Sequence, residues 1–118
     1  MKKGWMYILL CADGSYYTGS TNDLDLRLQQ HQNGEGANHT RKRLPVQLVY
    51  IEAFQRIADA FKREKQVQGW TRKKKEALIH EMPETLHELA KCLNETSHEH
   101  YESGDGGFGS AQPPRTVP

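Results

Sequence analysis

The chain has 118 residues, which suits a single domain with a modest hydrophobic core. Its two cysteines form neither a disulfide framework nor a paired metal-site spacing, so reduced and buried thiols are expected. No apolar run is long enough to span a bilayer, and no signal peptide precedes the first predicted strand. These features argue against a disulfide-stapled or membrane-spanning protein, and we expect a cytoplasmic one.

Charge is distributed unevenly along the chain. Residues 1–81 contain 14 Lys and Arg against 9 Asp and Glu, a net charge of +5, whereas residues 82–118 contain 2 against 6, a net charge of −4. A basic first part favours a polyanionic partner, although charged faces are more often simply solvated.

Two stretches rich in β-forming residues, 5–11 and 15–20, flank residues 12–14. The Asp-Gly pair between them predicts an antiparallel hairpin with a type I′ turn, in which both central residues have positive φ. Tyr7 and Tyr17 are then expected to stand near each other on neighbouring strands. Taken alone, the pattern favours ordinary strand tyrosines over a functional pair.

Residues 22–33 predict a helix, with capping residues at its start and Gly34 just past its end. Arg27 and His31 lie four positions apart, so a cation and an imidazole would stand side by side on one face. The alternative is an exposed ladder of Asp23, Arg27 and His31 that has no function.

The segment from residue 34 to residue 45 is too polar for a core and predicts a mobile basic loop. Four of its side chains suit phosphate contacts: His39, Arg41, Lys42 and Arg43. Residues 46–54 predict a third strand with apolar side chains on both faces, which suits a central place in the sheet.

The helix predicted over residues 56–68 carries a carboxylate on its apolar side. With a period of 3.6 residues, Glu64 falls in the middle of the buried stripe expected for Ile57, Ala60, Phe61 and Val67. A carboxylate there is costly unless it is paired, hydrogen-bonded or bound to a metal. Glu64 is therefore expected to be a metal ligand or half of a buried ion pair with Arg27 or Arg63.

Thr71 is expected to cap a short basic helix over residues 72–79, whose lysines cover more than one face. Its exposed cations would meet solvent or a polyanion, and the candidates are Arg72, Lys73 and Lys74. The scattered histidines near the C-terminus have no tetrahedral-site spacing with cysteines, so no metal site is expected there.

Residues 84–94 predict an amphipathic helix, and the Gly- and Pro-containing sequence from Thr96 onward predicts disorder. The expected division is a domain of residues 1–82, a C-terminal helical segment of residues 83–95 and a disordered acidic tail of residues 96–118.

Several of these residues, in this order and spacing, resemble the GIY-YIG nuclease superfamily, and most closely its small stand-alone members of the UPF0213 type. The resemblance covers residues 4–82 and rests on Trp5-Met6-Tyr7, Tyr17-Thr18-Gly19, Arg27 with His31, the basic loop, and Glu64 within Arg63-Glu64-Lys65. Trp5-Met6 stands where the family name has Gly-Ile, and Thr18 stands where the second tripeptide has Ile. Both are positions expected to serve packing. His39 could match a loop histidine of some members.

The resemblance implies an α+β fold, a small three-stranded antiparallel sheet sandwiched by helices. It also implies phosphodiester hydrolysis with one divalent metal, Mg²⁺ or Mn²⁺, held by Glu64. In such enzymes the tyrosine matching Tyr7 is thought to activate the attacking water. The residues matching Tyr17, Arg27 and His31 position the scissile phosphate and assist the chemistry.

Three functions compete at this stage. The first is a small metal-dependent endonuclease, with DNA favoured over RNA as the substrate. The second is a nucleic-acid-binding module without cleavage, and the third is a partner-binding domain that uses the acidic C-terminal helix. The joint presence of Tyr7, Tyr17, Arg27, His31 and Glu64 favours the nuclease, because a pure binding module needs only the basic residues.

Overall fold

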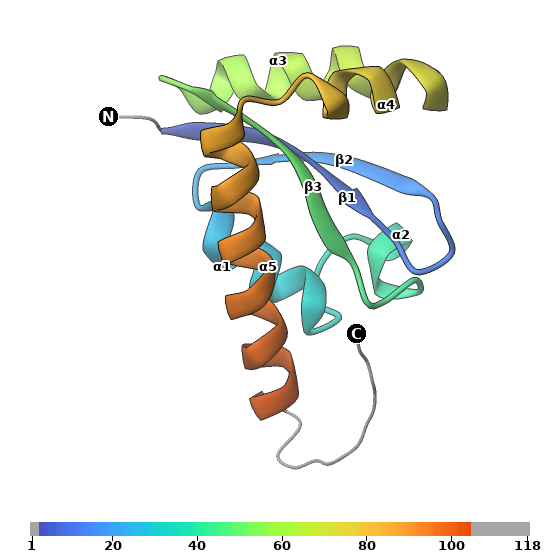
Figure 1. Cartoon of the computed structure of the whole chain (residues 1–118), viewed down its shortest axis with the longest axis vertical. Helices are drawn as coiled ribbons and strands as arrows, with labels where there is room; N and C mark the ends of the chain where they lie inside the picture. The colour runs from blue at the N-terminus through green and yellow to red at the C-terminus, as the bar shows by residue number, and fades with distance from the viewer. Residues whose placement is uncertain (1–2, 105–118) are drawn as a thin grey trace.

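The computed structural model describes residues 3–104. The elements in chain order are β1 (Gly4–Leu10), β2 (Tyr16–Thr21), α1 (Leu24–Gln32), α2 (Asn38–Arg41), β3 (Gln47–Phe54), α3 (Ile57–Gln68), α4 (Arg72–His80) and α5 (Glu84–Gly104). The strands form one antiparallel sheet with the order β2-β1-β3. Figure 1 shows α3 on one face of this sheet and α1 and α5 on the other. The predicted α+β fold, a three-stranded sheet between helices, is therefore confirmed.

The β1–β2 hairpin is present, but its turn is not the predicted type I′. The amide of Gly14 donates to the carbonyl of Cys11 at 2.9 Å, and the amide of Cys11 donates to the carbonyl of Ser15 at 2.8 Å. Gly14 has φ of 87°, and no described non-glycine residue has positive φ, so Asp13 does not adopt it. The connection is a three-residue loop, a turn followed by one left-handed glycine.

Strand β3 lies at an edge of the sheet, which corrects the central place predicted from its apolar faces. Both of its faces are covered all the same, because α3 and α5 pack near it. The side chain of Asn94 on α5 also pairs with the edge, accepting from the amide of Leu48 at 2.7 Å and donating to its carbonyl at 2.9 Å. Because both faces of β3 are covered and its edge is partly paired, β3 has the apolar sequence that is typical of a central strand.

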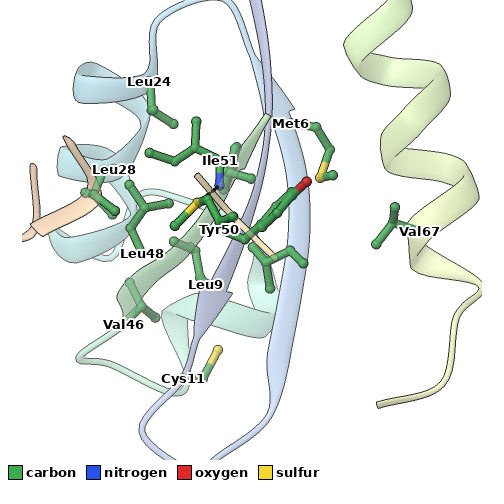
Figure 2. Close-up of a cluster of buried hydrophobic side chains, with 14 residues drawn as sticks. Met6, Leu9, Cys11, Leu24, Leu28, Val46, Leu48, Tyr50, Ile51 and Val67 are labelled. Carbon is green, nitrogen blue, oxygen red and sulfur yellow. Dashed lines mark hydrogen bonds between the residues drawn. The ribbon is translucent and has the colours of Figure 1, made fainter. Parts of the chain in front are cut away.

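The hydrophobic core lies on both faces of the sheet. Figure 2 shows Met6 and Val67 between the sheet and α3, and Leu24 and Leu28 where α1 faces it from the other side. Ala90 of α5 is buried in the same cluster, so this helix belongs to the packed body of the protein.

The buried face of α3 is centred on Ala60, Glu64 and Val67. Ile57 and Phe61 were expected inside, but they are 42% and 50% exposed. The buried stripe predicted for α3 was therefore rotated, relative to the buried face in the structure, toward the larger residues Ile57 and Phe61. The small side chain of Ala60 lets the helix lie close to the sheet and leaves its larger neighbours on the flanks.

Helix α5 is longer than predicted, since it continues to Gly104. The glycines and prolines that predicted disorder begin only at Gly104, so they give no reason for a helix to end near Thr96. Residues 96–104 of the predicted tail thus lie within α5, and residues 105–118 lie outside the described part of the chain.

Two smaller expectations also change. The segment predicted as a loop contains the single-turn helix α2, and its Thr40 is fully buried. Cys11 is buried as expected, whereas Cys92 is exposed on α5. Across the described residues, no helix has the length and apolar character needed to cross a membrane.

Candidate active site

Three side chains form a buried hydrogen-bonded chain beside β2. The hydroxyl of Tyr7 lies 2.9 Å from Nε2 of His31, and Nδ1 of His31 lies 2.8 Å from the hydroxyl of Thr40. Thr40 donates its only hydroxyl proton to the carbonyl of Ala37 at 3.0 Å. Nδ1 of His31 must therefore carry the proton that Thr40 accepts, which leaves Nε2 to accept from Tyr7.

Two glycines make room for this chain. A Cβ at Gly19, opposite Tyr7 in the β1–β2 register, would lie 2.5 Å from the Tyr7 hydroxyl. A Cβ at Gly36 would overlap with the imidazole of His31. The glycine of the second tripeptide thus serves the close approach of the phenol to the backbone of β2.

The hydroxyl of Thr40 is expected to contribute to stability, and the hydroxyl of Thr18 offers a matched contrast. Thr40→Val should lower the free energy of unfolding by about 1–3 kcal/mol, because the buried Nδ1–H of His31 loses its acceptor. Thr18 is also buried, but its hydroxyl has no hydrogen-bond partner among the described residues, so Thr18→Val should be neutral or stabilising. Urea denaturation of the two variants checks this, and equal losses would contradict it.

Burial sets the protonation states of this chain. It raises the pKa of Tyr7 to about 12, an effect that the nearby Arg27 partly opposes. It lowers the pKa of His31 to about 4, and the positive charge of Arg27 acts in the same direction. Both shifts disfavour a resting tyrosinate–imidazolium pair, so Tyr7 is a neutral donor and His31 a neutral acceptor.

His31 is expected to make the fold sensitive to mild acid. Its pKa is about 4 when folded and roughly 6.5 when unfolded, so between these values the unfolded chain binds more protons. The free energy of unfolding should then fall as the pH drops, by about 2 kcal/mol between pH 7.5 and 5. Urea denaturation across this range should show a flatter dependence for His31→Gln. The exposed His80 provides the control, and a wild-type slope that His80→Gln removes instead would contradict the assignment.

Tyr17 and Arg27 complete this side of the site. The ring of Tyr17 lies 6.5 Å from that of Tyr7 and 5.4 Å from that of His31, and it is only partly buried. Burial raises the pKa of Tyr17, whereas the positive charge of Arg27 lowers it. The predicted proximity of the two tyrosines is confirmed, and Arg27 is the cation that interacts with both phenols.

Glu64 approaches β2 from the opposite face of the sheet, because it belongs to α3. Its carboxylate accepts from the hydroxyl of Ser20 at 2.6 Å and from the amide of Gln68 at 2.7 Å. The Gln68 amide also donates to the backbone carbonyl of Thr18 at 3.3 Å, which ties the carboxylate to β2. The negative charge of Glu64 raises the pKa of both Tyr7 and Tyr17, so it acts across the strand on the tyrosine side.

The alternative of a buried ion pair between Glu64 and Arg27 or Arg63 is wrong. Arg63 pairs with Glu52 at 2.9 Å, and the one cation near Glu64 among the described salt bridges is the exposed Lys65, at 3.7 Å. Neutral hydrogen-bond donors therefore hold this carboxylate.

Glu64 is the residue that could hold a divalent metal. The described residues contain no group of three or more His, Cys, Asp or Glu that could enclose an ion. Mg²⁺ does not need such a cage, since it is commonly bound by one or two carboxylates together with substrate phosphates and water. One fixed carboxylate beside a basic, tyrosine-lined site fits this mode of binding.

His39 and Arg43 lie against the hairpin turn. Nε2 of His39 is 2.9 Å from the hydroxyl of Ser15, and the His39 ring stacks on that of Tyr17 at 6.1 Å. Arg43 forms a 2.8 Å ion pair with Asp13 and donates to the carbonyl of His39. The structure thus brings His39 to the tyrosines and gives Arg43 a structural contact with the turn.

The basic helix α4 approaches the same turn from the other side. Arg72 donates to the carbonyl of Gly14 at 2.6 Å and lies over the ring of Tyr16. Lys74 lies 4.3 Å from the ring centroid of Trp70. Arg41, Lys42 and Lys73 are also exposed to solvent and could meet a ligand.

Sequence reasoning missed four residues that support the site: Ser15, Ser20, Thr40 and Gln68. Ser20 and Thr40 are single hydroxyls without a motif of their own, and their partners lie 44 and 9 positions away along the chain. Gln68 had a signal, because it follows Glu64 by one helical turn on the same face.

Comparison with known proteins identifies the family. Residues 3–77 match the model of the GIY-YIG catalytic domain. The UPF0213 protein of Bacillus pumilus (strain SAFR-032) is 48% identical over 92 residues, which cover 75% of this chain and 94% of that protein. The UPF0213 protein of Staphylococcus saprophyticus is 47% identical over 81 residues, which cover 69% of this chain and 99% of that protein.

A solved structure is also similar to this chain. The solution NMR structure of the UPF0213 protein from Bacillus halodurans has 44% identity, covers 65% of this chain and 82% of that chain, and superposes with a TM-score of 0.44. The resemblance inferred from the sequence is confirmed, and the chain belongs to the GIY-YIG family as a relative of the UPF0213 proteins.

Proposed function

We propose that this protein is a small metal-dependent endonuclease that hydrolyses phosphodiester bonds in nucleic acid, with DNA favoured over RNA. The observation that carries the proposal is the meeting of two groups at β2. A hydrogen-bonded phenol and imidazole, Tyr7 and His31, lie on one side, and the fixed carboxylate of Glu64 acts on the Tyr7 phenol from the other. A protein that only bound nucleic acid would need neither of these groups.

Tyr7 is proposed to orient the attacking water. Its hydroxyl proton is directed to His31, so a lone pair of its oxygen can accept a hydrogen bond from water or receive a proton as its own moves to His31. Because its pKa is about 12, Tyr7 would act as a member of this relay and not as a free tyrosinate. Tyr7 is only 2% exposed, so the water must enter the site to reach it.

The other residues are proposed to act on the phosphate. Arg27 supplies positive charge beside the phenols, which would stabilise the negative charge on the oxygens of the pentacoordinate transition state. Tyr17 offers a more accessible hydroxyl that can donate to a phosphate oxygen. A Mg²⁺ or Mn²⁺ ion held by Glu64 would supply Lewis-acid polarisation of the phosphate and a bound water of lowered pKa.

Binding to nucleic acid is expected to weaken steeply with salt. The net charge of +5 in residues 1–81 and the exposed cations near the hairpin turn would release counterions from the phosphates. Affinity for a labelled oligonucleotide, measured by fluorescence anisotropy, should fall by about 100-fold or more between about 50 and 200 mM salt. Lys73→Gln should reduce the salt slope by about one, whereas Lys91→Gln on α5 should leave it unchanged. Affinity independent of ionic strength would contradict the proposal.

The direct test is cleavage by the purified full-length protein. Labelled single-stranded and double-stranded DNA and RNA are incubated with it, with Mg²⁺, with Mn²⁺ or with a chelator. Metal-dependent cleavage of DNA is the expected result.

A second candidate function is a nucleic-acid-binding module on the same fold. It is favoured by the metal-ligand count, since the described residues contain no group of three or more His, Cys, Asp or Glu that could enclose an ion. Salt-dependent binding without cleavage under any metal condition would establish this alternative.

A further inference from the structure

The side chain of His39 is held by a second series of hydrogen bonds, separate from that of Tyr7, His31 and Thr40. Its Nε2 lies 2.9 Å from the hydroxyl of Ser15, and this hydroxyl donates to Asp13 at 2.6 Å. The other carboxylate oxygen of Asp13 is 2.8 Å from Arg43. These hydrogen bonds connect the short helix α2 to the hairpin turn, two segments that are far apart in the sequence.

The direction of each hydrogen bond follows from the available protons. Hydrogen bonds from the side chain and backbone of Ser15, with the guanidinium of Arg43, lower the pKa of Asp13 to about 2, so its carboxylate is ionised and accepts. Ser15 gives its single proton to that carboxylate, so its oxygen accepts from His39. Nε2 of His39 therefore carries a proton, and Nδ1 has no hydrogen-bond partner among the described residues.

The two imidazoles of the site are thus prepared for different tasks. Both contact the ring of Tyr17, at 5.4 Å for His31 and 6.1 Å for His39. His31 is fully buried, and both of its nitrogens are engaged. His39 is partly exposed, its Nε2 is linked through Ser15 to the carboxylate of Asp13, and its Nδ1 is open to a ligand.

We propose, resting on the function proposed above, that protonated His39 donates the proton from Nδ1 to the leaving oxygen of the phosphodiester, and that Ser15 and Asp13 are positioning residues for this step. The oxygen of water forms a bond to phosphorus as one proton of that water passes to the relay of Tyr7 and His31, and the bond from phosphorus to the leaving oxygen breaks. The electron pair of that bond stays on the leaving oxygen, which takes the proton. His39 is left neutral, with its Nε2–H still on Ser15, and regains a proton from solvent.

The test compares oxygen and sulfur leaving atoms. The full-length protein is given Mg²⁺ and oligonucleotides with one scissile linkage, either natural or with sulfur at the 3′- or the 5′-bridging position. A thiolate leaves without protonation, so a variant that lacks only the proton donor should recover on the substrate whose leaving atom is sulfur. His39→Ala should slow cleavage of the natural linkage by about 100-fold or more, yet come within about threefold of wild type on one of the sulfur substrates.

The positioning residues and a control complete the design. Ser15→Ala keeps the backbone contact of the turn but removes the link to His39, so it should slow only the natural linkage, by about tenfold. Glu64→Gln, which leaves proton donation intact, should stay defective on every substrate. Equal losses for His39→Ala on the oxygen and sulfur substrates would overturn this inference while leaving the nuclease proposal standing. A wild-type protein that cleaves nothing would overturn both.

Discussion

Glu64→Gln is expected to abolish metal-dependent cleavage and to leave the fold intact. Removing the one fixed carboxylate of the site removes the negative charge that a divalent cation requires, and we expect a loss of at least about 100-fold in cleavage rate. The measurement is a single-turnover cleavage assay with Mg²⁺ or Mn²⁺, made alongside urea denaturation without metal.

The stability result follows from the neighbours of Glu64. In the variant, the amide oxygen can accept from Gln68 while the amide nitrogen donates to Ser20, whose hydroxyl can turn to accept. No buried cation is left without a partner, because the nearest is the exposed Lys65. The free energy of unfolding should therefore change by no more than about 1 kcal/mol, not by the 3 kcal/mol or more that breaking a buried ion pair would cost.

Glu52→Gln is the matched control. Glu52 also lies on the α3 face of the sheet, and its carboxylate pairs with Arg63 at 2.9 Å. This variant should lose a little stability and keep full cleavage, since the pair is partly exposed. Full cleavage by a folded Glu64→Gln protein would falsify the assignment of Glu64 as the metal ligand.

Local patterns predicted the elements well but not their environment. The alternation of strand residues and the Asp-Gly pair located the hairpin, because these signals act over a few residues. Whether β3 is central or at an edge depends on what covers it, and Asn94, 46 positions away from Leu48, supplies the pairing that makes the edge tolerable. No local signal contains that contact.

The rotation of α3 has a similar origin. Hydrophobic periodicity weights large side chains, so it placed Ile57 and Phe61 inside and Glu64 beside them. In the structure a small residue and the carboxylate occupy the contact face, and the large residues are exposed. Apolar periodicity therefore located Glu64 correctly in the buried stripe but wrongly placed Ile57 and Phe61 inside it, and a carboxylate at the contact face fits a functional site that departs from the usual packing rule.

Within the candidate site, the residues that belong to the family motifs were predicted, whereas the residues that hydrogen-bond to them were not. Tyr7, Tyr17 and His31 are found together as the resemblance implied. Thr40, which fixes the tautomer of His31, lies in a segment predicted to be a mobile loop. A supporting residue needs one atom in the right place, and a single hydroxyl leaves no periodic or compositional trace in the sequence.

Tyr7→Phe is expected to slow cleavage by about 100-fold or more and to destabilise the fold. The substitution removes the hydroxyl that would orient water, which is the contribution of a positioned proton-transfer group. It also leaves Nε2 of His31 without its donor in a fully buried position, at a cost of about 1–3 kcal/mol. Single-turnover cleavage and urea denaturation of the same preparation measure the two effects.

Tyr50→Phe is the control that removes a buried tyrosine hydroxyl outside the site, so it distinguishes a catalytic role of Tyr7 from the general effect of losing a buried hydroxyl. Tyr50 is also a buried strand tyrosine whose pKa is raised to about 12 by burial, but its nearest charges are Glu52 and Arg63, outside the site. This variant should keep wild-type cleavage. If Tyr7→Phe also keeps it while Tyr17→Phe loses it, the phenol that orients water is the more accessible Tyr17, and the hydrogen bond from Tyr7 to His31 serves only to hold the site together.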